Sequence, residues 1–372
     1  MFFQMSNGEP AWIATYKTGG IFMKSKIKNV LLPLSLMLLA LTACSESSAT
    51  SSRNSTDNTS SESSARSSQK STDNTSEAYS IGVIQLVEHP SLNASYEGFV
   101  QALADNGYEE GELVSYDFQN AQGDTNNLST ISDRFVSNNV DMVLAISTPA
   151  TQAIAGKTTT IPIIATAVTS YTESGLIDSN EAPGGNISGT SDMNPIAAQI
   201  ELGIELFPET ETVGIIYNSS ETNSVLQASI AKQEIERLGL NYSESTVTNS
   251  NDVYQAMESL VTKSDLIYIP TDNVLAATMP TVGEIAAAAK IPVICGSTDM
   301  VKSGGLLTMG IDYYQLGYQT GSMALSVIDG ADIGDMPIQF AQNSDEIIIN
   351  GVMAEAIGYS VPEEYQYAVV MP

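Results

Sequence analysis

The chain has 372 residues, with 43 acidic side chains against 14 basic ones and a formal net charge of −29. This length suggests two or three folded units, and an acidic surface repels phosphate groups, which excludes nucleic-acid binding. Two cysteines, Cys44 and Cys295, and a single histidine exclude a zinc cage of the usual kind, so no metal and no cofactor are expected.

The first 43 residues have the pattern of an export signal. Lysines at positions 24, 26 and 28 precede an apolar stretch, 30–41, that is too short to span a bilayer as a mature helix. The stretch ends in the tetrad Leu41-Thr42-Ala43-Cys44, where small residues suit a signal peptidase and the Cys44 thiol can receive diacylglycerol. We predict a signal peptide over 1–43, with Met23 as the better start, and lipidation of Cys44. An ordinary secretory signal or a buried apolar helix is the alternative.

A low-complexity segment follows the predicted lipidation site. Residues 45–77 lack Val, Ile, Leu and aromatic side chains, and the hexapeptide STDNTS occurs at 55–60 and again at 71–76. Such a segment cannot bury enough apolar surface to order itself. We therefore expect 44–78 to be a lipid-anchored, disordered Ser/Thr/Asn linker that gives the rest of the chain reach.

From residue 79 onward, short apolar runs alternate with helical patterns. In the first half, strands are expected at 81–86, 114–118, 141–146 and 163–167, with helices at 91–106 and 128–137. In the second half, strands are expected at 213–217, 266–269 and 292–295, with helices at 196–207, 224–238 and 282–289. Buried Val, Ile and Leu runs between helices predict parallel sheets that are covered on both faces.

The pattern restarts after Pro195, which indicates an α/β fold with two doubly wound parallel-sheet lobes joined by crossing strands. The crossing strands are expected at 189–194 and 309–312, and a helix over 313–328 would return to the first lobe. We expect lobe 1 to contain 79–192 with about 312–340, and lobe 2 to contain 193–311 with about 341–372. Ligands of open α/β sheets lie beyond the carboxyl ends of the strands, so paired lobes predict a closing cleft.

The loops at the expected strand ends supply the candidate ligand-binding residues. The first lobe offers hydroxyl groups and helix N-termini, and the second offers carboxylates. This division suits a zwitterion, with its carboxylate at a helix start that includes Ser147 and Thr148 and its ammonium facing Asp272 or a neighbouring acidic residue. The candidates are His89, Ser147, Thr148, Thr166, Thr169, Asp192, Asn218, Glu221, Thr271, Asp272, Asn273, Ser297 and Asp312.

Each of these residues also has a plain structural interpretation. Ser, Thr and Asp at helix starts are most often simple N-caps, and His89 by itself is more often a surface or loop histidine. Cys295 is expected to be a small buried hydrophobe. The clustering of six such loops at strand ends is what favours a binding site.

The body of the chain resembles the solute-binding lipoproteins of ABC importers of the tryptophan-type (ABC_sub_bind) family. The matching segments are HPSLNASYEGFVQAL at 89–103, AISTPATQA at 145–153, GTSD at 189–192, IYNSSETNS at 216–224, YIPTDN at 268–273 and GIDYYQLGYQTG at 310–321. The resemblance implies a type I periplasmic-binding fold and delivery of solute to a permease with ATPase subunits. It also implies an aromatic amino acid as ligand, tryptophan or phenylalanine.

By position, Ser147, Thr148, Thr166 and Thr169 match the family's carboxylate-side loops, and Asp272 and Asn273 match its second-lobe anchor. No arginine lies in these loops, so a bidentate guanidinium clamp is not expected. We therefore expect an extracytoplasmic, membrane-anchored binding protein.

Other classes of ligand and of protein remain as alternatives. A nucleoside, a sugar or a peptide-derived ligand could also stack on tyrosines, and a surface adhesin or sensor is a third class. An enzyme is not expected, because His89 is the sole histidine, no GxSxG is present and no GxGxxG follows a strand.

Overall fold

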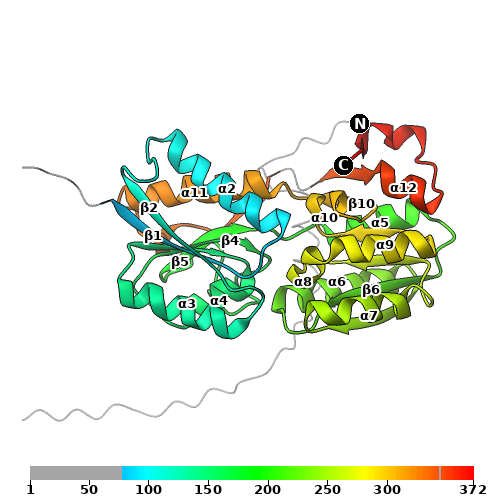
Figure 1. Ribbon diagram of the computed structural model, residues 1–372, viewed down its shortest axis with the longest axis horizontal. Coiled ribbons are helices and arrows are strands. Elements are labelled where there is room, and N and C mark those ends of the chain that lie inside the picture. The colour runs from blue at the N-terminus through cyan, green and yellow to red at the C-terminus, as the bar shows by residue number, and fades with distance from the viewer. Residues whose placement is uncertain (1–77, 343–344) are drawn as a thin grey trace, which may run out of the picture. The chain divides into compact units, whose positions relative to one another are not determined.

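A computed structural model describes residues 78–342 and 345–372 of the chain (Figure 1). The predicted signal peptide, the predicted lipidation site Cys44 and all but the last residue of the predicted linker lie outside these residues. Within them, no helix is both long enough and apolar enough to cross a membrane.

The first lobe is built on a six-stranded sheet with the strand order β11-β5-β4-β3-β1-β2, and every pairing in it is parallel. Its strands are β1 (Tyr79–Gln85), β2 (Val114–Asn120), β3 (Met142–Ile146), β4 (Ile163–Val168), β5 (Ile187–Ser191) and β11 (Gln339–Phe340). Its helices are α2 (Pro90–Asp105), α3 (Thr125–Asn138), α4 (Thr148–Ala155), α11 (Tyr313–Ile328) and the 3-10 turn η2 (Ile333–Asp335).

Helices cover both faces of this sheet. Successive strand residues point to opposite sides, and apolar side chains on both sides must be buried. Leu144 belongs to the apolar cluster beneath α2 and α11, whereas its neighbours Val143 and Ala145 belong to the cluster beneath α3 and α4. Strands buried on both faces read as continuous apolar runs, which is why MVLAI of β3 could be predicted.

The second lobe is built on a seven-stranded sheet with the order β13-β12-β10-β9-β8-β6-β7. Its strands are β6 (Thr212–Asn218), β7 (Asn241–Val247), β8 (Leu266–Ile269), β9 (Val293–Cys295), β10 (Leu307–Gly310), β12 (Glu346–Asn350) and β13 (Val369–Val370). Its helices are α5 (Ile196–Leu206), α6 (Thr222–Arg237), α7 (Val253–Leu260), α8 (Asn273–Ala277), α9 (Met279–Ala289), α10 (Thr298–Lys302) and α12 (Gly351–Ile357), with 3-10 turns η1 (Ser250–Asp252) and η3 (Glu363–Ala368).

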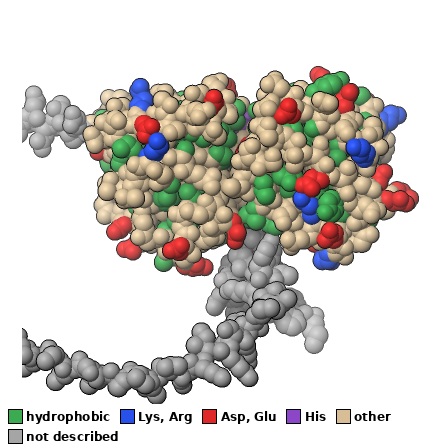
Figure 2. Space-filling view, turned by 90° about the horizontal axis from the view of Figure 1, so that it is seen from below, with side chains coloured by type: hydrophobic (Ala, Val, Ile, Leu, Met, Phe, Trp, Pro, Cys, Tyr) green, Lys and Arg blue, Asp and Glu red, His purple; other side chains and the backbone are tan. Residues whose placement is uncertain are grey.

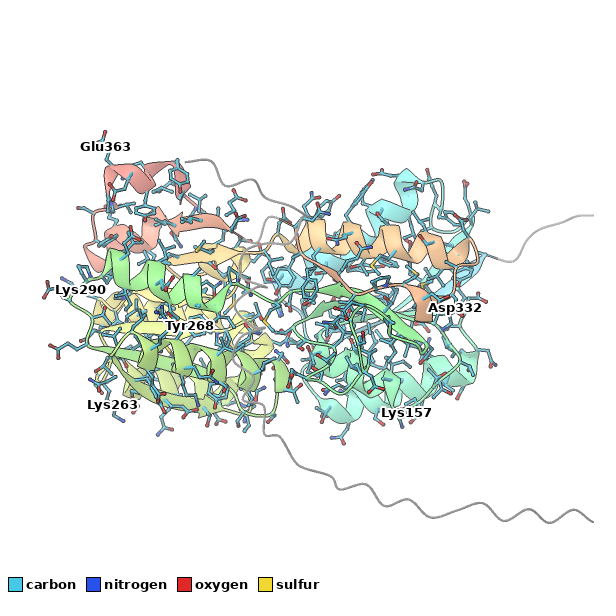
Figure 3. All side chains as sticks on the ribbon, turned by 180° about the vertical axis from the view of Figure 1, so that it is seen from behind. Lys157, Lys263, Tyr268, Lys290, Asp332 and Glu363 are labelled. Atoms are coloured by element: carbon cyan, nitrogen blue, oxygen red, sulfur yellow. The ribbon has the colours of Figure 1, made fainter. Side chains whose placement is uncertain are left out.

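The second lobe has one cluster of buried apolar side chains, and Tyr268 and Cys295 are fully buried in it. In Figure 3 Tyr268 lies in the interior of this lobe, while Lys157, Lys263 and Lys290 lie at the edges of the molecule. Figure 2 likewise shows lysine and arginine side chains scattered singly over the face in view. Cys295 is thus a buried thiol, as predicted, and the basic side chains gather nowhere on this face.

The expected α/β architecture with two parallel sheets is present, with differences in detail. The expected crossing strands belong to the sheets: β5 ends at Ser191 and β10 ends at Gly310, and the segments that lead from them to α5 and α11 are not strands. One pairing, β10 with β12, is antiparallel. The helix expected at 128–137 begins earlier, at Thr125, because the Asp124 side chain accepts a hydrogen bond from the Asn126 N–H and caps it.

Two helices of the first lobe approach each other very closely. A Cβ atom added at Gly317 of α11 would lie 1.9 Å from the Ser95 carbonyl oxygen of α2, and one added at Gly98 of α2 would lie 2.0 Å from the Tyr314 carbonyl oxygen. Only glycine permits this contact. Because α11 follows the second crossing, its packing on α2 fixes the point at which the chain re-enters the first lobe.

Candidate ligand-binding site

A small cavity of about 20 Å³ lies where strand ends of the two sheets meet. The first lobe contributes Ala167 of β4 and residues that follow β1, β5 and β10, and the second contributes residues that follow β6, β8 and β9. The lining residues are His89, Ser91, Leu92, Ala167, Asp192, Asn223, Thr271, Asp272, Asn273, Ala276, Ser297, Met300 and Tyr313. Amino-acid-sized ligands need a pocket of several hundred cubic ångströms, so a ligand enters only when the lobes separate.

Asp192 is the centre of the first group of polar side chains in this cavity. It follows β5 and is 3 % exposed, and its two carboxylate oxygens accept hydrogen bonds from the Thr169 hydroxyl at 3.0 Å and the Tyr313 hydroxyl at 2.5 Å. Burial raises the pKa of Asp192, and the two hydroxyl donors act in the opposite direction. A buried carboxylate that faces a cavity and has only neutral donors favours a cationic partner.

Gln227 connects this group to the second lobe. Its Nε2 donates to the Thr169 hydroxyl at 3.1 Å and to the Thr271 hydroxyl at 2.5 Å, and its Oε1 accepts from the Thr271 N–H at 3.2 Å. Thr169 belongs to the first lobe, whereas Gln227 and Thr271 belong to the second. A single fully buried amide therefore bridges the two lobes beside Asp192.

Glu221 is the centre of a second polar group. Its carboxylate accepts hydrogen bonds from the amides of Asn218 at 3.0 Å, Asn223 at 3.4 Å and Asn273. Burial, together with the charge of the adjacent Asp272, raises the pKa of Glu221 to about 8. Three side-chain amides hold this carboxylate beside the cavity, although it does not line it.

His89 links the second polar group to the first lobe. Its Nε2 lies 3.3 Å from the Oδ1 atom of Asn273, across the junction of the lobes. Burial lowers the pKa of His89 to about 4, so the imidazole is neutral at physiological pH. The hydroxyl oxygens of Ser91 and Ser297 lie 3.4 Å apart and form another contact between the lobes.

Unusual backbone conformations mark the first-lobe side of the site. Ser147 has a φ of 104° and Ala167 a φ of 55°, values that side-chain-bearing residues seldom adopt. The β4–β5 register shifts between Ala165 and Val168, which places Ala167 at an irregularity of the strand. Such strain persists where surrounding structure enforces it, and it is typical of binding sites.

The predicted site residues fall into three sets. Six of them line the cavity, and three others, Thr169, Asn218 and Glu221, bond to cavity-lining residues. The remaining four are in other settings. The lining six are His89, Asp192, Thr271, Asp272, Asn273 and Ser297.

The four residues away from the cavity make local contacts. Ser147 caps α4 by accepting from the Ala150 N–H, and the Thr148 hydroxyl accepts from the Thr169 N–H at 3.4 Å. Thr166 accepts from the Thr190 hydroxyl inside the first lobe. Asp312 caps α11 and is exposed. Asp272 lines the cavity, but its oxygens accept from the Leu275 and Asn218 N–H groups, as an N-cap does.

Sequence reasoning missed several residues of the site. Tyr313, Asn223 and Gln227 carry hydrogen bonds in it, and Leu92, Ala276 and Met300 give it an apolar side. A signal for Gln227 was present, since it lies one helical turn after Asn223 and therefore on the same face of α6. Tyr313 had no such signal, because its partner Asp192 is far away in the sequence.

Two doubly wound sheets whose strand ends share a polar cavity define a solute-binding protein of the type I periplasmic-binding fold. Residues 80–368 match the family described as ABC transporter substrate binding protein. The chain belongs to this family, whose members bind solutes outside the cytoplasm. In the described residues, no group of His, Cys, Asp and Glu side chains could hold a metal ion.

Three similar proteins have informative names. A tyrosine-binding protein of Clostridioides difficile (strain R20291) is 41 % identical over 325 residues, covering 87 % of this chain and 90 % of that protein. A solved ABC domain in complex with L-Trp from Streptococcus pneumonia is 35 % identical, with a TM-score of 0.76, covering 79 % of this chain and 100 % of that one. A ligand-free, open structure of a substrate binding protein with adhesive properties from Clostridium difficile is 41 % identical, with a TM-score of 0.61, covering 79 % and 99 %.

The two solved structures differ in how well they superpose. The open structure is more similar in sequence, yet the L-Trp complex has the higher TM-score. The small cavity and the direct hydrogen bonds between the lobes also differ from what an open arrangement would have. The described chain therefore has the closed arrangement of its lobes.

Proposed function

We propose that this protein captures an aromatic amino acid by lobe closure and that Asp192 binds the ammonium group of the ligand. The observation that carries the proposal is the buried Asp192 carboxylate, which faces the cavity with hydroxyl groups as its side-chain donors. The tyrosine-binding relative and the L-Trp complex support an aromatic side chain.

The charge balance of the site supports a cationic group in the ligand. Two carboxylates, those of Asp192 and Asp272, are buried in the cavity lining, whereas the raised pKa of the neighbouring Glu221 leaves that group largely protonated at neutral pH. No lysine or arginine of the described residues lines it, and His89 is neutral. A neutral sugar or nucleoside would leave this negative charge uncompensated, at a cost of roughly several kcal/mol per buried ion.

The position of Asp192 also suggests where the rest of the amino acid lies. Thr169, which donates to Asp192, lies directly against Thr148 at the start of α4. We propose that the ligand carboxylate lies on the Thr169 side of Asp192, toward the N-terminus of α4 as the sequence led us to expect, although Ser147 and Thr148 do not themselves line the cavity. The ammonium anchor differs from that expectation, since the oxygens of Asp272 already cap α8 and accept from the Asn218 N–H.

Binding of amino acids to residues 79–372 tests this proposal directly. Isothermal titration with the twenty amino acids should give saturable binding of at least one aromatic member. Ligand at a hundredfold excess over Kd should stabilise the fold by about 2.7 kcal/mol. If no aromatic amino acid raises the melting temperature, the proposed ligand class is wrong.

We further propose that lipid on Cys44 anchors the protein beside an ABC permease with its ATPase subunits. The LTAC tetrad and the polar linker support the anchor, and the family supports the transporter. Deletion should abolish uptake of the labelled amino acid, and the wild-type gene should restore it. Cys44→Ser should lose incorporation of a labelled fatty acid and leave the membrane fraction; retention of both would contradict the anchor.

A further inference from the structure

His89 has one ring nitrogen with a partner and one without. Nε2 pairs with Asn273 Oδ1, whereas Nδ1 is buried and has no hydrogen-bond partner. The side chain is 6 % exposed and lines the cavity. Buried polar atoms are nearly always hydrogen-bonded in native proteins, so this nitrogen points to a ligand group.

The hydrogen-bond network determines which kind of group that is. The Asn273 amide nitrogen donates to Glu221, which turns its Oδ1 atom toward His89. Because Oδ1 is an acceptor, Nε2 must carry the proton of the neutral imidazole. Nδ1 is then an acceptor, and its partner must be a hydrogen-bond donor.

The apolar side of the cavity surrounds this acceptor. Leu92 lies three residues after His89 at the start of α2, and Ala276 lies three residues after Asn273 on α8. Residues at this spacing lie on the same face of a helix. With Met300 they form the apolar lining near His89, a place suited to the ring of the ligand rather than to its charged end.

A second unpartnered acceptor belongs to the charged end. Asn223 Oδ1 is buried without a partner, and the Asn223 amide nitrogen donates to the Thr271 carbonyl at 3.0 Å. The Thr271 hydroxyl accepts from Gln227, which also bonds Thr169 beside Asp192. Asn223 and Asp192 can therefore share the N–H groups of the ammonium, which leaves His89 for the side chain.

We propose that His89 Nδ1 accepts a hydrogen bond from a donor on the aromatic ring of the ligand, so that tyrosine or tryptophan is selected over phenylalanine. This inference rests on the proposed function and names the subclass of ligand. The phenolic O–H of tyrosine and the indole N–H of tryptophan are such donors. Phenylalanine lacks one and would leave Nδ1 buried and unpaired.

The size of the expected discrimination follows from the cost of an unpaired acceptor. Leaving a buried acceptor without a partner corresponds to about a 10- to 100-fold loss in affinity. Sites built to hydrogen-bond a substrate group reject analogues that lack it by large factors for the same reason. This loss of affinity is expected when only the ring donor is removed and the ammonium and carboxylate groups of the ligand are unchanged.

Ligand pairs on the wild-type protein provide the first test. Isothermal titration would compare tyrosine with para-fluorophenylalanine and phenylalanine, and tryptophan with its derivative methylated on the indole nitrogen. Whichever of tyrosine and tryptophan binds, its Kd should be at least tenfold lower than that of its partner compound without the ring donor. Equal affinities of tyrosine, para-fluorophenylalanine and phenylalanine would overturn the role of His89 while the proposed function stands. Failure of every aromatic amino acid to bind would instead refute the proposed function.

Variants give the second test. In His89→Phe, the ratio of the phenylalanine Kd to the tyrosine Kd should fall to near one. Ser264→Ala is a matched control, because the Ser264 hydroxyl is also buried and unpartnered but does not line the cavity. That control should keep the wild-type ratio. A ratio that persists in His89→Phe would assign the discrimination to another group and overturn the proposal.

Discussion

The Tyr313 hydroxyl donates a hydrogen bond of 2.5 Å to Asp192, although 121 positions separate the two residues in the sequence. Asp192 lies where the chain leaves the first lobe, and Tyr313 lies where the chain returns to it. Both side chains are buried in the cavity lining. The residue that we propose as the ammonium anchor is thus held by the two segments beside which the lobes must pivot.

Replacement of Asp192 by asparagine should separate binding from stability. Asp192→Asn removes the negative charge at nearly constant volume, and loss of one partner of a buried charge pair costs about 2–5 kcal/mol of binding free energy. The Kd for the amino acid should therefore rise at least about 30-fold by titration calorimetry. The melting temperature of the ligand-free protein should not fall, because a buried uncompensated charge is removed.

Tyr313→Phe is the comparison for that variant. It keeps the Asp192 charge and removes one hydrogen bond, which is worth about 1.5–3 kcal/mol when the acceptor is charged. Its effect on Kd should be smaller than that of Asp192→Asn. Near-wild-type affinity of Asp192→Asn would place the ammonium elsewhere.

Gln227→Leu should shift the protein toward its open arrangement. Gln227 bridges Thr169 and Thr271 across the lobes, and the leucine cannot replace either hydrogen bond. A ligand that binds the closed state loses apparent affinity in proportion to the lost population of that state. We expect a weaker Kd and a larger radius of gyration in small-angle scattering without ligand.

Gln101→Leu is the matched control for this effect. Gln101 is an exposed residue of α2 that bonds only within its own helix, to Asp105 at 2.7 Å. Its replacement should leave both the scattering curve and Kd as in the wild type. Equal scattering of Gln227→Leu and wild type would show that this amide does not hold the lobes together.

The sequence predicted those elements whose pattern depends on burial. The apolar run of β3 and the 313–328 helix were recognisable because both lie in the core, where side-chain periodicity is enforced. Strand β7 was not predicted, because it is an edge strand with the polar sequence NYSESTV and mostly exposed side chains. Edge strands lack the double burial that produces an apolar run.

The candidate site was predictable in its loops but not in its pairings. Loops after parallel strands must gather at one sheet edge, which led to Asp192, Asp272 and His89 as candidates, and all three line the cavity. Which carboxylate is available to a ligand depends on its local hydrogen bonds. The oxygens of Asp272 are used to cap α8, whereas Asp192 accepts from hydroxyl groups and still faces the cavity. That difference arises from three-dimensional contacts, and no spacing in the sequence encodes it.

Gly317→Ala should destabilise the first lobe. The added methyl group would meet the Ser95 carbonyl oxygen at 1.9 Å, which forces α11 away from α2. Overpacking of this kind costs about 1–3 kcal/mol, and urea unfolding should show it. Gly156→Ala is the control, because Gly156 has a φ of −70° and its nearest atoms lie 3.6 Å away. If both variants unfold at the same urea concentration, the helix contact is not tight.

The buried carboxyl of Glu221 should make stability depend on pH. Burial and the nearby Asp272 charge raise its pKa from 4.5 to about 8, so between these values the folded state binds more protons than the unfolded chain. The free energy of unfolding therefore falls as pH rises through this window, by at most about 1.4 kcal/mol per pH unit. His89 acts in the opposite sense, but only between its lowered pKa of about 4 and its ordinary value of 6.5.

Glu221→Gln isolates this contribution between pH 6.5 and 8, because His89 is present in both proteins and its own effect cancels in the difference between them. The variant loses some stability at every pH, because glutamine cannot accept all the hydrogen bonds that the asparagine amides donate to the carboxylate. Its stability should nevertheless decline less steeply than that of the wild type as pH rises. The difference in free energy of unfolding, measured by urea titration at four pH values, should thus move in favour of the variant. Parallel curves would mean that Glu221 is ionised throughout, with the three amides outweighing the cost of its burial.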